Sequence, residues 1–134
     1  MTQVFVYGTL KREQRLSWLL KGSEFVKAAP TLRFDYDMLS CGHFPAVIRG
    51  TYRILGEVYR VNERTLKKLD FVERVPLFYK RKEIPVLGLD EPAFIYMVNE
   101  EFTDYLTSEQ NRTPVTEQIR MDIQARTKEW VWNR

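Results

Sequence analysis

Alternation of apolar and polar side chains along the chain predicts several strands. Residues 4–7 are apolar at every position, which is typical of a strand covered on both faces, so we expect it to be central in its sheet. Residues 56–61 alternate with a period of two, as a half-buried strand does. A turn-rich segment separates two further strand candidates, residues 77–86 and 92–98. Prolines and glycines interrupt residues 24–54, where we expect short strands and turns.

Other segments carry the apolar spacing of an amphipathic helix. Apolar residues recur on one face of residues 63–73, and Asn62 stands where an N-cap is expected. Residues 11–21 have a similar but less regular spacing and end next to a glycine. Residues 113–132 also follow helical spacing, and Pro114 suits a first helical turn. We therefore expect a helix in each segment, the last of them forming a C-terminal helical tail.

Length and composition indicate one globular domain. The chain has 134 residues, which leaves room for a single modest core. Its 44% hydrophobic and 29% charged residues differ from the composition of disordered chains. No linker or internal repeat divides the sequence, so we expect a single domain over residues 1–134. The sequence contains no signal peptide pattern and no run of about 18 apolar residues, so we expect a cytoplasmic protein without membrane association.

Charge and residue content exclude several kinds of site. The net charge of +3 is too small to indicate a nucleic-acid or membrane partner by itself. Cys41 is the only cysteine and His43 the only histidine, which excludes an intramolecular disulfide and a metal site of several histidines. Nucleotide-binding and zinc motifs are absent, so we expect neither metal nor cofactor. A Cys41–His43 nucleophile pair is one alternative, although a histidine in such a turn is more often structural.

The turn after the strand at residues 4–7 is the first candidate for chemistry. Tyr7 is followed by Gly8, Thr9 and Leu10, where the expected strand passes into the expected helix. Backbone N–H groups at such a junction can bind an oxyanion. The alternative is an ordinary strand-to-helix turn in which Thr9 serves as a cap.

An acidic side chain at a helix end is the second candidate. Glu73 falls on the inward face of the helix expected at residues 63–73, where burial would raise its pKa toward neutrality. Such a carboxyl group can act as a general acid or base. The alternative is a solvated Glu73 that pairs with a nearby arginine or lysine. Asp70 lies near the same face and ranks second.

Two further features have competing interpretations. Residues 74–82 contain basic side chains around Tyr79 without an acidic one, which suits either a nucleic-acid surface or a solvated strand edge. We favour the strand edge. Trp130 and Trp132 could anchor a partner, but packing of a helix end on its own domain is the simpler explanation.

Four segments together carry a family resemblance. They read VFVYGTLKR at residues 4–12, FPAVI at 44–48, GEVY at 56–59 and LDFVERVPLFYKR at 69–81. In this order and spacing the chain resembles the gamma-glutamylcyclotransferase-like superfamily, above all its gamma-glutamylamine cyclotransferase and AIG2-like branch. The resemblance extends over about residues 3–98, and the tail from about residue 99 diverges.

The resemblance implies a fold, an activity and a set of site residues. The fold would be α+β, a small mixed β-barrel with flanking helices. Glu73 matches the family's general acid/base, the backbone of Tyr7, Gly8, Thr9 and Leu10 matches the loop that holds the glutamyl group, and Tyr79 matches a tyrosine beside the pocket. Gamma-glutamyl amides would be converted into 5-oxoproline and a free amine, by a monomer or homodimer that needs no cofactor. The alternative is a noncatalytic member that binds a small anionic ligand or a macromolecule.

Overall fold

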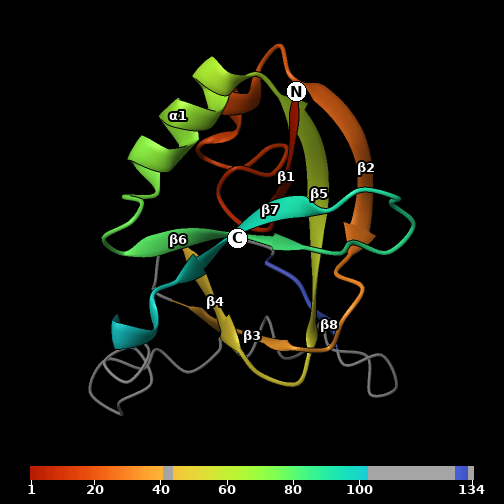
Figure 1. Cartoon of the computed structure of the whole chain (residues 1–134), viewed down its shortest axis with the longest axis vertical. Helices are drawn as coiled ribbons and strands as arrows, with labels where there is room; N and C mark the ends of the chain where they lie inside the picture. Colours follow the sequence, from red (N-terminus) through yellow and green to blue (C-terminus); the bar gives the residue numbers. More distant parts are fainter. Residues whose placement is uncertain (41–43, 103–128, 133–134) are drawn as a thin grey trace.

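The computed structural model describes residues 1–40, 44–102 and 129–132 (Figure 1). Helix α1 (Glu63–Val72), the short 3-10 helix η1 (Ser17–Leu20) and a set of strands make up most of this part of the chain, and residues 100–102 are also helical. The strands are β1 (Thr2–Val6), β2 (Glu24–Pro30), β3 (Tyr36–Ser40), β4 (Pro45–Arg49), β5 (Arg53–Val61), β6 (Tyr79–Ile84), β7 (Ala93–Val98) and β8 (Glu129–Trp130).

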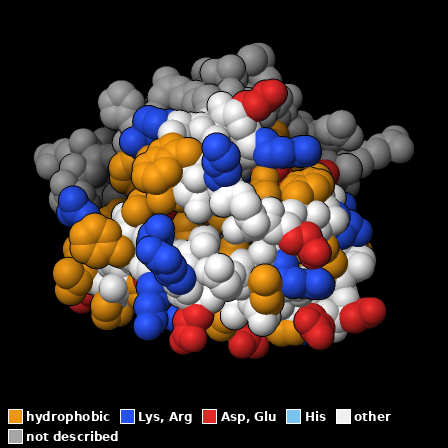
Figure 2. Space-filling model, turned by 90° about the horizontal axis from the view of Figure 1, so that it is seen from above, with side chains coloured by type: hydrophobic (Ala, Val, Ile, Leu, Met, Phe, Trp, Pro, Cys, Tyr) orange, Lys and Arg blue, Asp and Glu red, His pale blue; other side chains and the backbone are white. Residues whose placement is uncertain are grey.

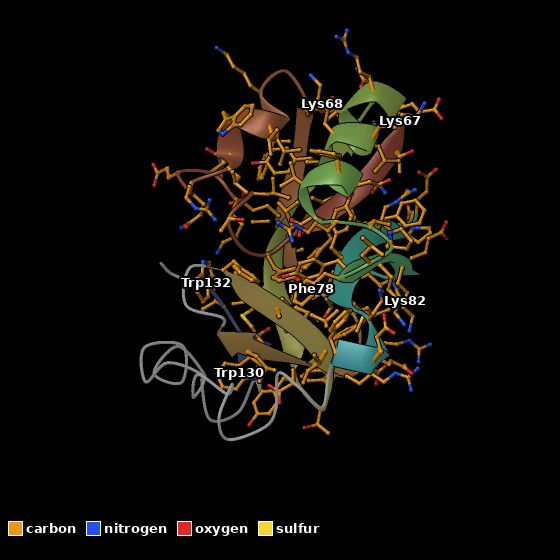
Figure 3. The ribbon with its side chains drawn as sticks, turned by 90° about the vertical axis from the view of Figure 1, so that its left-hand side faces the viewer. Lys67, Lys68, Phe78, Lys82, Trp130 and Trp132 are labelled. Atoms are coloured by element: carbon orange, nitrogen blue, oxygen red, sulfur yellow. The ribbon has the colours of Figure 1, made fainter. Side chains whose placement is uncertain are left out.

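The main sheet is built around β1. Its strands follow the order β2-β5-β1-β7-β6, and β8 pairs with β5 off this path. β1 runs antiparallel to β5 and parallel to β7. Val4 and Phe5 are fully buried, which confirms the prediction of a central strand covered on both faces. β3 and β4 form a separate antiparallel hairpin, which lies below α1 in Figures 1 and 3.

The mixed α+β class is confirmed, whereas closure into a barrel is not shown. The outer strands β2 and β6 approach each other just beyond their ends, where Thr31 and Val86 form an isolated bridge. The N–H of Leu32 donates to the Pro85 carbonyl, and that of Leu87 donates to the Pro30 carbonyl, each at 3.1 Å. In the described ranges no continuous ladder joins these two edges.

Helix α1 forms where the sequence predicts it. The Asn62 side chain accepts a hydrogen bond from the Thr65 N–H at 2.8 Å, which confirms the predicted N-cap. Leu66 and Leu69 are buried on the inward face. The helix ends at Val72, and Glu73 is its C-cap. Arg74 follows with a φ of 52°, a left-handed conformation that turns the chain away from the helix axis.

The helix predicted at residues 11–21 is wrong, because only η1 is helical there. The preceding loop is closed by bonds that do not propagate an α-helix: the Lys11 N–H donates to the Gly8 carbonyl at 3.0 Å, and the Leu16 N–H to the Thr9 carbonyl at 2.8 Å. Glu13 has a φ of 67°, which an α-helix cannot contain. The apolar spacing in this segment reflects packing of its leucines against the core.

The C-terminal helix predicted at residues 113–132 is also wrong where the structure describes it. β8 pairs in parallel with β5, and the remainder of that segment lies outside the described residues. Trp130 and Trp132 are 5% and 1% exposed, and the Trp130 ring lies 5.0 Å from that of Tyr52. Figure 3 shows both tryptophans at the edge of the hairpin strands. Their burial supports packing on the domain over a partner anchor.

Within the described part of the chain, no helix has the length and apolar character that crossing a membrane requires.

The burial of Trp132 predicts that the end of the chain contributes to stability. Replacing Trp132 by alanine should lower the free energy of unfolding by about 3 to 5 kcal/mol, because a large cavity would remain in the core. The matched control is Trp18→Ala, since Trp18 is 67% exposed and its removal should change stability by no more than about 0.5 kcal/mol. Urea titration followed by circular dichroism measures both values, and equal effects would contradict the assignment of Trp132 to the core.

Candidate active site

A cavity of about 410 Å³ lies where the loop after β1, the end of α1 and strands β4, β6 and β7 meet. Its lining brings together the loop of Tyr7 to Leu10, Glu73 and Tyr79, although these residues come from distant parts of the chain. The lining residues are Tyr7, Gly8, Thr9, Leu10, Arg15, Leu16, Phe44, Pro45, Val72, Glu73, Arg74, Phe78, Tyr79 and Tyr96.

The loop after β1 forms one wall of the cavity. Tyr7, Thr9 and Leu10 are at most 9% exposed, and the Tyr7 hydroxyl donates to the Tyr96 carbonyl at 2.6 Å. A Cβ atom on Gly8 would lie 2.5 Å from Cγ of Pro45, so only glycine lets the loop approach the start of β4 this closely. The loop is therefore held against the sheet from both ends, with its backbone at the cavity wall.

Glu73 lies at the C-terminal end of α1, on the wall beside this loop. Burial raises the pKa of its carboxyl group from the ordinary value of 4.5 to about 7. None of the ion pairs found between described residues involves Glu73. Desolvation with no ion pair among the described residues favours the inward-facing interpretation over a paired carboxylate.

Tyr79 begins β6 and is 6% exposed. Its hydroxyl donates to the Pro45 carbonyl at 3.0 Å, which ties β6 to the start of β4. Phe78 packs edge-on against the Tyr79 ring at 4.8 Å and against Phe44 at 6.4 Å. Figure 3 shows Phe78 between the end of α1 and the hairpin. This part of the cavity wall is therefore aromatic.

Sequence reasoning missed Tyr96, which lines the cavity from β7. Its hydroxyl donates to Oδ1 of Asp70 at 2.8 Å, and Nε of Arg81 lies 2.9 Å from the same oxygen. Asp70, ranked second from the sequence, is absent from the lining and lies behind Tyr96. No local signal marks Tyr96, because a tyrosine within an apolar strand is an ordinary core residue. The exposed Arg15 and Arg74 at the cavity opening were also missed.

The other sequence candidates lie apart from this cavity or outside the described residues. Cys41 and His43 belong to the latter group. Across residues 1–40, 44–102 and 129–132, no cluster of histidine, cysteine and acidic side chains could hold a metal ion. β6, which carries much of the basic segment, is the last strand in the sheet order, as the strand-edge interpretation requires. On the face drawn in Figure 2, basic and acidic side chains are mixed and do not gather into one basic patch.

Comparison with known proteins identifies the family. The family model described as gamma-glutamyl cyclotransferase, AIG2-like, matches residues 4–119. A Vibrio cholerae protein provisionally named a gamma-glutamylcyclotransferase is 37% identical over 81 residues, which are 60% of this chain and 70% of that protein. The human gamma-glutamylaminecyclotransferase is 36% identical over 102 residues, covering 69% of this chain and 67% of that protein. A mouse AIG2-like crystal structure superposes with a TM-score of 0.67 at 26% identity, covering 80% of this chain and 83% of that one. The chain therefore belongs to the AIG2-like gamma-glutamyl cyclotransferase family.

Proposed function

We propose that the protein is a gamma-glutamyl cyclotransferase that converts a gamma-glutamyl amide into 5-oxoproline and a free amine. The observation that carries the proposal is the meeting of Glu73, with a carboxyl pKa raised to about 7, and the loop of Tyr7 to Leu10 on one cavity. The name of the human relative specifies a gamma-glutamylamine, and we extend this class of substrate to the present chain.

The reaction needs one proton carrier and a site for negative charge. Ionised Glu73 takes a proton from the α-ammonium of the substrate, and the resulting amine attacks the γ-carbonyl carbon within the same molecule. Backbone N–H groups of the loop stabilise the tetrahedral oxyanion. When the intermediate collapses, the C–N bond to the leaving group breaks and protonated Glu73 returns the proton to the departing amine. A pKa near 7 suits both steps, because the carboxyl group is then neither a weak base nor a weak acid.

The size and lining of the cavity suit a small-molecule substrate. Its volume falls in the range of sites for small molecules. Leu16, Phe44 and Phe78 give part of the cavity an apolar wall. Intramolecular attack consumes neither water nor a cofactor, so the reaction requires neither of them in the cavity.

Replacement of Glu73 by glutamine should abolish 5-oxoproline release. The amide keeps the shape of the side chain but cannot carry the proton, so we expect a loss of at least about 100-fold in kcat with the fold retained. The measurement is 5-oxoproline release from a panel of gamma-glutamyl amines and gamma-glutamyl dipeptides. Glu83→Gln is the matched control, since Glu83 is exposed on β6 away from the cavity. A native chain that releases no product from any member of the panel would favour the noncatalytic alternative.

Activity should fall as the pH is lowered through 7. The base form of Glu73 is needed to accept the ammonium proton, and the pKa of about 7 means that it disappears below this pH. We expect kcat/KM to decrease about tenfold for each pH unit on the acid side. The Glu83→Gln control should keep the same profile. A kcat/KM that stays constant from pH 8 down to pH 5.5 would rule out Glu73 as the base.

Burial of Glu73 should also make stability depend on pH. Between pH 4.5 and 7 the carboxyl group is protonated in the folded chain and ionised in the unfolded chain, so the folded state binds more protons. Its contribution to stability is therefore lost as the pH rises through this window, by up to about 3 kcal/mol. Glu73→Gln lacks this loss, and its advantage over the native chain should grow between pH 4.5 and 7. Urea titrations across this range test the prediction, and a constant difference would contradict it.

A further inference from the structure

Behind the cavity wall next to Glu73, one hydrogen bond and one ion pair link three side chains, Tyr96, Asp70 and Arg81. Tyr96, only 3% exposed, lines the cavity and donates its hydroxyl proton to Asp70 at 2.8 Å. Nε of Arg81 lies 2.9 Å from the same Asp70 oxygen. The Arg81 guanidinium also lies 4.8 Å from the centre of the Phe94 ring, which helps to hold it in place.

The pairing with Arg81 sets the direction of the Tyr96 hydroxyl. An ionised carboxylate has no proton to give, so the bond between Tyr96 and Asp70 can form only with the tyrosine as donor. Burial and the neighbouring Asp70 and Glu73 carboxyl groups raise the pKa of Tyr96, which keeps the hydroxyl protonated. The Tyr96 hydroxyl proton therefore points to Asp70 and away from the cavity. The hydroxyl oxygen can only accept a hydrogen bond from a ligand.

Tyr96 therefore presents an acceptor to this side of the cavity. The hydroxyls of Tyr7 and Tyr79 likewise donate to carbonyl oxygens of the protein, those of Tyr96 and Pro45. Glu73 in its base form is an acceptor as well. Such a surface matches a ligand group with several N–H donors and no acceptor, which describes an ammonium group better than a carboxylate.

We infer that Tyr96 binds the α-ammonium of an amino-acid end group, and that Asp70 and Arg81 are positioning residues that hold the Tyr96 hydroxyl in its accepting orientation. The inference rests on the proposed function for the nature of that end group, a gamma-glutamyl moiety. With two N–H groups directed at Tyr96 and Glu73, the ammonium is oriented so that the proton to be removed faces the carboxylate.

Binding of two matched ligands tests this inference without requiring turnover. L-glutamate and glutarate share the carbon chain and both carboxylates but differ in the α-ammonium, and titration calorimetry measures the affinity of each. Tyr96→Phe should weaken L-glutamate about tenfold, since a hydrogen bond to a charged group is lost, and should change glutarate by less than twofold. Tyr59→Phe is the matched control, because its hydroxyl also contacts a carboxylate, Glu57 at 3.1 Å, but lies off the cavity lining.

The Asp70→Asn variant tests the positioning role. With Arg81 held by the amide oxygen, the amide N–H would donate to Tyr96 and redirect the hydroxyl proton into the cavity. We expect the affinity of Asp70→Asn for L-glutamate to fall at least tenfold relative to the native chain. Its affinity for glutarate should be unchanged or higher. Equal weakening of both ligands in either variant, an unchanged affinity for L-glutamate, or no binding of L-glutamate by the native chain would overturn the inference. Selective binding without any 5-oxoproline release would instead refute the proposed function alone.

Discussion

Pairing of β1 on both sides is the constraint on which the rest of the structure depends. Because β5 and β7 hydrogen-bond to its two edges and both of its faces are covered, β1 has no freedom to shift its register. The fixed register of β1 therefore fixes the position of Tyr7, where the loop begins. Close contact of Gly8 with Pro45 then fixes the path of the loop backbone. A loop that binds charge through its N–H groups needs this rigidity, since misplaced dipoles stabilise no oxyanion.

Two acidic side chains at the site differ in their surroundings. Asp70 forms an ion pair with Arg81, whereas Glu73 forms none among the described residues. Glu73 and Asp70 lie three residues apart at the end of α1, and burial raises the pKa of the Glu73 carboxyl group to about 7. Among the ion pairs of the described residues, Arg81 pairs with Asp70 and not with Glu73. One carboxyl group is thereby available for proton transfer, while the other holds Tyr96 in position. In the proposed mechanism these two acidic residues serve different purposes because their surroundings differ.

Several contacts hold the walls of the cavity to elements distant in sequence. Tyr79 hydrogen-bonds to Pro45, Tyr7 to the backbone of Tyr96, and Nζ of Lys11 to the Trp132 carbonyl at 2.6 Å. The last of these links the loop after β1 to the end of the chain. Stability of the core and geometry of the proposed site are therefore coupled.

The sequence by itself determined β1, α1 and its N-cap, because each depends on local periodicity or on a capping residue a few positions away. It also indicated that Glu73 faces inward, since helical geometry fixes the direction of a side chain relative to its neighbours. The helix predicted at residues 11–21 failed because packing of leucines on a core imitates helical spacing in a segment of turns. The strand β8 was missed because its partner, β5, lies 76 residues away at the pair Arg53↔Glu129. Only the tertiary structure decided that Tyr96 would line the cavity and that Arg81 would pair with Asp70 and not with Glu73. Such contacts depend on which strands become neighbours, and the local sequence does not encode the strand order.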